Sequence, residues 1–575
     1  MKNIRKILIA STIITTSSVG IYSCQESFLE RPPLGAISEA SLANAAGVNG
    51  ALVSTYRTLT GNNVGAWYTS AMNWAWGGVR SDDAYKGTEA SDQNQLNPIE
   101  RFEVLPDNGS VNDKWRACYD GIGQANVTLR LLAQAKDISD ADKKRIEAET
   151  KFLRAYHHFE AKRHFNNVPW VDEKVISTAD FKAIKNDQNI YPQIEAEFKF
   201  AFDNLPNTQS ALGRVNKWAA GAYLAKVYMY QNKFNEAKTL FDQIIANGVN
   251  NKGQRYGLLT DYQDVFKGDF ENERETIFGI QYTVGDGTGG ANSNKDAELT
   301  NPHNDGPVGC CGFYQPSQSL ANAYRTSATG LPLVDTYNNV DIKNHENSPA
   351  DFPDRGSVDP RLDFTLGRVG VSFHDWGVAR ASWIRNLANG GPFLPKKHIH
   401  YRSEVNKYFI PGGWGQGQLG KNQIVYRYAD LLLMAAECEV EIGSLEKARE
   451  YVNLVRARAK ASAYIKDATG KDEANYQIST YTATWTDKNV ARNAVRFERF
   501  LELAMEGHRF YDLVRWGIAD QVINAFFTKE QRARTHLAGA RFTKGKDEYL
   551  PIPQYVINQS RTSDGQQGIK QNAGY

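Results

Sequence analysis

The sequence contains few cysteines, no long apolar segment beyond its N-terminus and no strongly basic stretch. Only 5 of its 575 residues are cysteine, and none forms a CxxC pair, which argues against a thioredoxin-like redox site or a common zinc-binding pattern. No segment after the first 24 residues is apolar enough to span a bilayer, which requires about 20 predominantly apolar residues. The formal net charge is only +2. Because nucleic-acid binding requires basic patches, we expect no nucleic-acid partner.

Sequence motifs that are typical of enzymes are also missing. The chain contains no G-x-S-x-G, HExxH or P-loop pattern. The acidic loop 351–363 contains Asp351, Asp354, Asp359 and Asp363, but their spacing does not match the EF-hand calcium pattern. The sequence therefore predicts a protein that is not an enzyme and that holds no cofactor and no metal.

Residues 1–24 have the pattern of a secretory signal that ends at a lipid-modified cysteine. A basic start is followed by an apolar stretch from Ile7 to about Ile14 and then by small residues. The final Ile21-Tyr22-Ser23-Cys24 resembles a bacterial lipobox. It implies a signal peptide of residues 1–23 and acylation of Cys24, and two or more acyl chains anchor a protein stably where one does not. The alternative is a soluble exported protein that is cleaved nearby.

The segment directly after Cys24 indicates the side of the membrane. Residues 25–30, with Glu26 and Glu30, resemble the acidic surface-export signal of some Gram-negative lipoproteins. We therefore expect an outer-membrane location, with contact to the membrane through the lipid anchor only, and a protein that faces the cell exterior.

The remaining cysteines fall into two kinds. Cys118 and Cys438 lie in helical patterns and are predicted to be small core residues. Cys310 and Cys311 are adjacent in a Gly-rich loop. In an exported protein they fit either a vicinal disulfide, which would make the loop rigid, or two reduced thiols.

Helical periodicity dominates three blocks of the chain, residues 112–165, 191–247 and 425–517. Two of these blocks contain the same internal pattern, in which two small residues stand 12 positions apart on either side of a turn. The pairs are Ala225 with Ala237 and Ala436 with Ala448. Small residues at this spacing let two antiparallel helices pack closely, as in tetratricopeptide (TPR) repeats. We therefore predict a mostly α fold of stacked TPR-like helix pairs, with a generic helical hairpin as the alternative.

The segments between these blocks have a different composition. Residues 60–110 and 250–424 are rich in Gly, Asn, Asp, Pro and aromatic residues, which is typical of long loops with short strands. Loops of this length in a folded protein are often functional. We expect residues 24–575 to form one domain, in which the helices carry a large irregular half that binds the ligand.

Seven motifs follow one another in a fixed order behind the lipobox. They are Phe28-Leu-Glu-Arg-Pro-Pro33; Arg154-Ala-Tyr156 with Phe165-Asn-Asn-Val-Pro-Trp170; Gly213-Arg-Val-Asn-Lys-Trp-Ala219; Asp359-Pro-Arg-Leu362; Tyr426-Arg-Tyr-Ala-Asp430 with Ala435-Ala-Glu437; Glu498-Arg499 with Glu502, Glu506-Gly507, Arg509 and Asp512-Leu-Val-Arg-Trp516; and Tyr549-Leu-Pro-Ile-Pro553 with Gln571-Asn-Ala-Gly-Tyr575. In this order they resemble the SusD/RagB family, over nearly the whole mature chain.

The resemblance implies both the fold and the function. SusD/RagB proteins combine TPR-like helix pairs, an α-superhelix, with an irregular loop-rich half. They are surface partners of a SusC-like TonB-dependent outer-membrane transporter and capture glycans or peptides for import. No cofactor and no catalytic residue is implied.

The charged residues of the sixth motif are predicted to be structural. Glu498, Glu502, Glu506, Arg499 and Arg509 have helical spacings that permit ion pairs, so they could fix one helix to another. A catalytic carboxylate pair is the competing interpretation, but no nucleophile motif accompanies these residues.

A glycan site is expected to combine aromatic rings, which pack on the C–H faces of sugars, with amide and carboxylate groups that bind hydroxyls. The family places ligand contacts in the N-terminal loop region and in the loops between the repeat blocks. Trp74 and Trp76 are two positions apart, so in an extended segment they would share a face. The predicted ligand-binding residues are Trp67, Asn73, Trp74, Trp76, Asp82, Asp83 and Tyr85, together with Phe313, Tyr314 and Gln315; Trp376, Trp383 and Trp414 rank lower. The alternative is that these aromatic residues lie in the core or against the transporter.

Several functions remain compatible with the sequence. The leading hypothesis is a glycan-binding uptake protein, and the second is a binder of peptides or protein fragments for the same kind of uptake system. The third is a TPR-type scaffold without a nutrient ligand, and the export signal and lipobox argue against a cytosolic scaffold of this kind. A surface glycoside hydrolase would need two carboxyl groups about 5–10 Å apart that face one groove, which a sequence cannot show.

Overall fold

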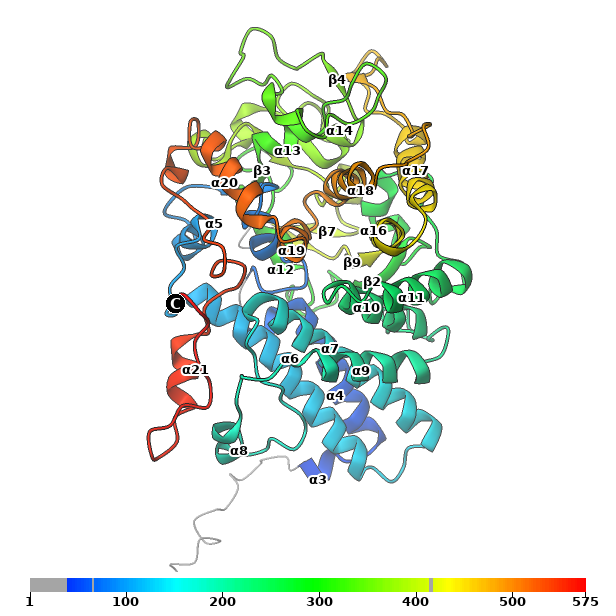
Figure 1. Ribbon diagram of the computed structural model, residues 1–575, viewed down its shortest axis with the longest axis vertical. Helices are drawn as coiled ribbons and strands as arrows, with labels where there is room; N and C mark the ends of the chain where they lie inside the picture. Colours follow the sequence, from blue (N-terminus) through cyan, green and yellow to red (C-terminus); the bar gives the residue numbers. More distant parts are fainter. Residues whose placement is uncertain (1–38, 65–66, 413–416) are drawn as a thin grey trace, which may run out of the picture.

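A computed structural model describes residues 39–64, 67–412 and 417–575 (Figure 1). The signal peptide, the predicted lipidation site Cys24 and the lower-ranked Trp414 lie outside these described residues. Long helices occupy one part of the molecule, and short strands and irregular segments occupy the other (Figure 1). In the part of the chain that the structure describes, no helix is both long and apolar enough to cross a membrane.

The long helices pack one after another in a single row. Each contacts the next along the row, and α11 packs against α16 although residues 248–427 separate them in the chain. The predicted TPR-like stack is therefore confirmed, and α4 extends it at the N-terminal end, where no helix was predicted. The row consists of α4 (Ala45–Arg57), α6 (Gly109–Gln134), α7 (Asp140–Phe165), α9 (Tyr191–Asn204), α10 (Lys217–Met229), α11 (Phe234–Asn247), α16 (Tyr428–Ile442), α17 (Leu445–Ala461) and α18 (Lys488–Leu503).

The helix pairs form for the reasons that the sequence indicated. Ala225, Ala237, Ala436 and Ala448 have no exposed surface, so the paired helices approach closely at these positions. Polar caps begin the helices: the side chain of Ser444, for example, accepts a hydrogen bond from the backbone of Lys447 at the start of α17. The third block, however, is not helical throughout, because residues 462–487 form an irregular segment between α17 and α18.

The loop-rich half contains short elements that join distant parts of the chain. In the described ranges, its strands form five separate pairs, β1 with β3, β2 with β9, β4 with β10, β5 with β6 and β7 with β8. The strands are β1 (Ala84–Gly87), β2 (Thr276–Ile280), β3 (Phe313–Pro316), β4 (Ser357–Val358), β5 (Leu366–Arg368), β6 (Phe393–Pro395), β7 (Phe409–Pro411), β8 (Gly417–Leu419), β9 (Gln423–Arg427) and β10 (Asn475–Tyr476). The short helices are α3 (Glu39–Leu42), α5 (Asn97–Arg101), α8 (Thr178–Ala183), α12 (Lys295–Leu299), α13 (Gln318–Ala323), α14 (Arg361–Thr365), α15 (Leu387–Gly390), α19 (Arg509–Arg515), α20 (Ala519–Glu530) and α21 (Gln554–Gln559).

Residues 74–79 form a π-helical turn, η3 (Trp74–Val79), which the sequence did not predict. Gly77 faces the backbone carbonyl of Gly507, and Gly78 faces the ring of Tyr314, at distances that leave no room for a Cβ atom. Because the two glycines have no side chain, the turn packs closely between β3 and the segment before α19. The expectation of an extended segment with both tryptophans on one face is therefore wrong.

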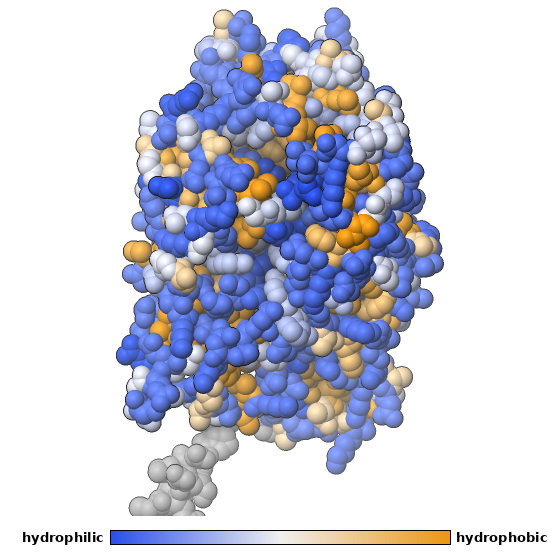
Figure 2. All heavy atoms as spheres, viewed as in Figure 1, coloured by the Kyte–Doolittle hydropathy of each residue, from blue (hydrophilic) through white to orange (hydrophobic). Residues whose placement is uncertain are grey.

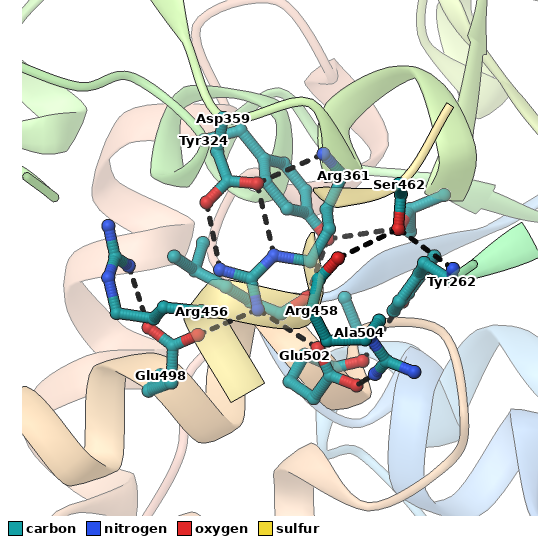
Figure 3. Close-up of polar contacts among 12 residues, drawn as sticks. Tyr262, Tyr324, Asp359, Arg361, Arg456, Arg458, Ser462, Glu498, Glu502 and Ala504 are labelled. Atoms are coloured by element: carbon teal, nitrogen blue, oxygen red, sulfur yellow. Dashed lines mark hydrogen bonds and ion pairs between the residues drawn. The ribbon is translucent and has the colours of Figure 1, made fainter. Parts of the chain in front are cut away.

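A buried ion-pair network joins the loop-rich half to the helices (Figure 3). Arg361, in α14, contacts Asp359 at 2.8 Å, Glu498 at 2.7 Å and Glu502 at 2.9 Å. Arg456 of α17 also contacts Glu498, at 2.8 Å. These side chains are at most 1% exposed, so each charge depends on its partners rather than on water.

Arg427, at the end of β9, is the second centre of this network. Its guanidinium contacts Glu275 at 3.0 Å, Glu502 at 2.7 Å and Glu506 at 2.8 Å. The prediction that Glu498, Glu502 and Glu506 are structural is therefore confirmed. Their partners, however, lie on other elements and not on their own helix, so the network fixes elements to one another.

The acidic loop 351–363 is likewise held by ion pairs. Asp354 contacts Arg325 at 2.7 Å, and Asp363 contacts Arg368 at 2.7 Å. Asp359 pairs with Arg361 in the network described above. Among the residues that the structure describes, no group of three or more His, Cys, Asp or Glu side chains is placed to hold a metal ion.

Candidate functional site

The predicted aromatic ligand contacts lie in the interior of the protein. Trp74 and Trp76 have no exposed surface, and their indole N–H groups donate to the backbone carbonyls of Trp67 and Tyr68. The ring of Trp74 packs against Phe313, with the ring centroids 5.8 Å apart. These rings therefore form the core beneath β3 and do not offer a face to a sugar.

The predicted polar contacts are engaged inside the protein as well. Asn73 donates to Glu160 at 3.0 Å, Asp82 pairs with Arg509 at 2.7 Å, and the hydroxyl of Tyr85 donates to Glu530 at 2.6 Å. This burial disagrees with the prediction of direct ligand contact for nine residues, because at most 1% of each side chain is exposed. The nine are Asn73, Trp74, Trp76, Asp82, Asp83, Tyr85, Phe313, Tyr314 and Gln315.

The remaining predicted tryptophans differ in exposure. Trp67 is half-buried. Trp376 is half-buried and donates to the carbonyl of His400 at 2.9 Å, whereas Trp383 is buried. Of the seven residues predicted in the N-terminal loop, only Trp67 is partly exposed to solvent.

The four described cysteines form one disulfide and two free, buried thiols. The structure joins Cys310 and Cys311 in a vicinal disulfide directly before β3. Cys118 and Cys438 are free and buried. The carbonyl of Gly312, next to the disulfide, accepts a hydrogen bond from Thr88 at 2.5 Å and so fixes the end of β1.

An open polar groove with a volume of about 1130 Å³ lies at the N-terminal end of α6. Its walls come from four segments of the chain: the segment before η3, residues 93–95, the first two turns of α6, and α21 near the C-terminus. We call this surface the α6 groove. Its lining residues are Tyr68, Gln93, Asn94, Gln95, Gly109, Asn112, Asp113, Arg116 and Tyr555.

Hydrogen bonds orient the polar groups of the α6 groove. Asp113 accepts from the Tyr68 hydroxyl at 3.0 Å and lies 3.5 Å from Arg116. Burial raises the pKa of Tyr68 to about 12, so its hydroxyl stays protonated and remains a donor at neutral pH. Among the described residues, the buried Oδ1 of Asn112 has no hydrogen-bond partner. A bound hydroxyl would supply the donor that this oxygen lacks.

The same face of α6 continues toward the loops of the other half. Asp120 accepts a hydrogen bond from Asn63 at 3.1 Å, and the neighbouring Asn62 donates to the carbonyl of Ala291 at 3.1 Å. Asp113, Arg116 and Asp120 are three and four residues apart, so they lie along one side of the helix. The two loop regions that were predicted to hold the ligand therefore meet beside this helix.

The α6 groove uses residues that the sequence prediction did not rank. Tyr68 directly follows the predicted Trp67, and its ring rests edge-on against the buried Trp76, with the ring centroids 6.3 Å apart. Tyr555 lies nearly the whole chain away from Tyr68, so no local pattern links them. The spacing of polar residues along α6 was the only signal in the sequence for this groove.

Figure 2 shows that the face seen in Figure 1 is mostly hydrophilic, with hydrophobic residues in separate groups.

Comparison with known proteins identifies the family. Residues 274–575 match the family model described as the SusD family, and residues 59–229 match the one described as starch-binding associating with outer membrane. The first match covers more than half of the chain, and the chain therefore belongs to the SusD family.

Individual relatives match over most of their length. SusD-like protein P25 of Formosa agariphila is 25% identical over 531 residues, which cover 87% of this chain and 88% of that protein. The structure of a laminarin-binding SusD-like protein has a TM-score of 0.65 at 23% identity and covers 92% of this chain and 100% of its own. The complex of surface glycan-binding protein A of Bacteroides thetaiotaomicron with laminarihexaose has a TM-score of 0.59 at 20% identity, with 92% and 99% of the two chains covered. These structures share the fold of this chain.

Proposed function

We propose that this protein is a glycan-binding lipoprotein of the outer-membrane surface, which captures oligosaccharides or polysaccharides and delivers them to a SusC-like TonB-dependent transporter. The SusD family and the glycan-binding names of structurally similar proteins support the ligand class. The single observation that carries the proposal is the α6 groove, an open surface that combines the ring of Tyr555 and the hydroxyl of Tyr68 with amide groups. Such a combination suits a ligand with apolar ring faces and many hydroxyls.

The chemistry of the α6 groove favours binding over catalysis. Of the described residues that line it, Asp113 alone carries a carboxylate, and this group is already bonded to Tyr68 and close to Arg116. Hydrolysis of a glycoside needs a second carboxyl group across the same groove. We therefore assign the α6 groove a binding role without turnover.

A soluble form that begins at residue 25 tests the ligand class by affinity electrophoresis on a panel of polysaccharides and peptide mixtures. We expect retardation by a glycan, and Tyr555→Ala is expected to weaken binding about tenfold to hundredfold because it removes an aromatic wall. Tyr464→Ala, at a half-buried tyrosine outside the α6 groove, serves as the control. Asn112→Ala should weaken binding as well, since it removes the unpaired acceptor.

The other outcomes of this experiment are equally informative. Glycan binding that resists both Tyr555→Ala and Asn112→Ala would place the site elsewhere. Retention of peptides without retention of any glycan would favour the peptide-uptake alternative. Trp74→Ala is not suitable as a test, because Trp74 is buried and its loss would disturb the fold.

The membrane anchor and the transport step rest on the lipobox-like segment and on the family. The name of the second family model supports association with the outer membrane. A strain that carries Cys24→Ser is expected to lose fatty-acid labelling of the protein and most growth on the captured glycan, because an unanchored protein is diluted away from its transporter. Normal growth of this strain, with the protein found free in the medium, would contradict the anchored uptake role.

A further inference from the structure

A second groove, mostly apolar, lies at the C-terminal end of α4. Its volume is about 1070 Å³, and it is lined by the end of α4, residues 211–214 and the segment after β2. Three of its apolar lining residues are buried and form its floor, namely Leu59, Ile280 and Tyr282. We call this surface the α4 groove.

Apolar side chains at the edge of the α4 groove are exposed to an unusual degree. Val53 is 56% exposed on α4, and Leu212, between two lining residues, is 44% exposed. Exposed aliphatic side chains that border an apolar hollow are typical of a surface that another segment covers. The α4 groove is therefore suited to docking, and its edge chemistry indicates what kind of segment would complement it.

The edge of the α4 groove is cationic. Arg57 is exposed at the last turn of α4, and among the described residues no carboxylate lies within ion-pair distance of it. Arg214 also lines the groove, but it is paired with Glu149 at 3.0 Å. A partner that combines apolar and acidic residues would complement both the floor and Arg57.

The chain itself contains such a segment immediately before the described residues. Residues 25–38 include the apolar Phe28, Leu29 and Leu34 and the acidic Glu26 and Glu30. Pro32 and Pro33 favour an extended backbone, which suits docking along a groove.

The segment is long enough to reach the α4 groove. Phe28 precedes α3 by 11 residues, which span at most about 36–40 Å when extended. The helix α4 that leads from α3 to the groove is 13 residues long, or about 20 Å. We propose that residues 25–34 dock in the α4 groove, with Phe28 and Leu29 on its apolar floor and Glu30 beside Arg57, so that the tether between Cys24 and α3 is held against the helical half.

Disulfide trapping in the chain from residue 25 to 575 tests this proposal. Phe28→Cys is combined either with Val53→Cys or with Val490→Cys, a valine on α18 that is 59% exposed and so matches Val53 in accessibility. After mild oxidation, we expect roughly tenfold more intramolecular cross-link with Val53→Cys, because docking raises the local concentration of the two thiols. The native free cysteines, Cys118 and Cys438, are buried and do not compete.

Two further measurements make the test independent of the exact register. Arg57→Glu is expected to reduce the cross-link to Val53→Cys, and the addition of Glu30→Arg is expected to restore it. Hydrogen exchange should show protection of residues 25–34 that is lost in Val53→Asp, a change that the fold tolerates because Val53 is exposed.

Several results would overturn the proposal. Equal cross-linking to Val53→Cys and Val490→Cys, with no protection of residues 25–34, would show that the segment does not dock. Cross-links between two chains would assign the α4 groove to a second copy instead. If a glycan protects the thiol of the single variant Val53→Cys from labelling, the α4 groove would be assigned to a glycan instead.

Discussion

Replacement of Arg427 by methionine is expected to lower the free energy of unfolding by about 3–5 kcal/mol. Arg427 contacts Glu275, Glu502 and Glu506, all of which are at most 6% exposed. Without the guanidinium, three carboxylates would compete for the remaining cations in a site that water does not reach. The cost of an uncompensated buried charge then exceeds the gain from any apolar contact that methionine makes.

Urea denaturation followed by tryptophan fluorescence measures this effect. The control is Arg380→Met, which removes an ion pair with Asp305 at a position where the arginine side chain is 67% exposed, and should cost less than about 1 kcal/mol. Adding Glu502→Gln to Arg427→Met should recover part of the loss, since it removes one of the stranded charges. Equal destabilisation by Arg427→Met and Arg380→Met would show that the buried network contributes no more than a surface pair.

The helical half and the charged motifs could be predicted because their signals are local. The alanine pairs and the turns between them fix the close approach of neighbouring helices, and the structure has both. The structural role of Glu498, Glu502 and Glu506 was also predicted. Their partners were not, because Arg427 and Arg361 lie far away in the sequence and helical spacing reports only neighbours on one helix.

The residues of the α6 groove could not be predicted in the same way. Residues 67–85 combine tryptophans with Asn and Asp, and this composition fits a sugar site and a buried layer equally well. The adjacent Gly77 and Gly78 were a signal for burial, because glycines in such a position allow the backbone and a ring to approach closely. Tyr68 and Tyr555 meet only in the folded chain, so the α6 groove appears only when the tertiary structure is known.

The aspartate at position 83 makes the second strong prediction, which concerns pH. Burial raises the pKa of Asp83 to about 8, and the neighbouring charge of Asp82 acts in the same direction. Asp83 accepts one hydrogen bond, from the backbone of Met505 at 3.2 Å, whereas among the described residues its buried Oδ1 has no partner. At neutral pH the folded protein therefore holds this carboxyl in its protonated form.

The sign of the pH effect follows from the two pKa values of Asp83. In the unfolded chain the carboxyl ionises near its usual pKa of about 3.9. Between about pH 4 and pH 8 folding must therefore take up a proton at this residue, so its contribution to stability is complete below pH 4 and is lost as the pH rises toward 8. Asp83→Asn removes the titration but keeps an acceptor for Met505. We expect the variant to be more stable than the wild type by a few kcal/mol at pH 8 and to match it at pH 4.

The contribution of Glu502 to stability depends on pH in the opposite direction, so Glu502 serves as the internal reference. Burial alone would raise its pKa, but Arg458, Arg427 and Arg361 outweigh this effect and lower the pKa to about 2. Its contribution is present above the unfolded value of about 4.3 and is lost as the pH falls toward 2. Melting temperatures of wild type and Asp83→Asn across pH 3–9 should therefore coincide on the acid side, where Glu502 and its neighbours control stability, and diverge above pH 4. Parallel curves over the whole range would mean that Asp83 is already ionised in the folded protein, with Arg509 compensating its charge as well as that of Asp82.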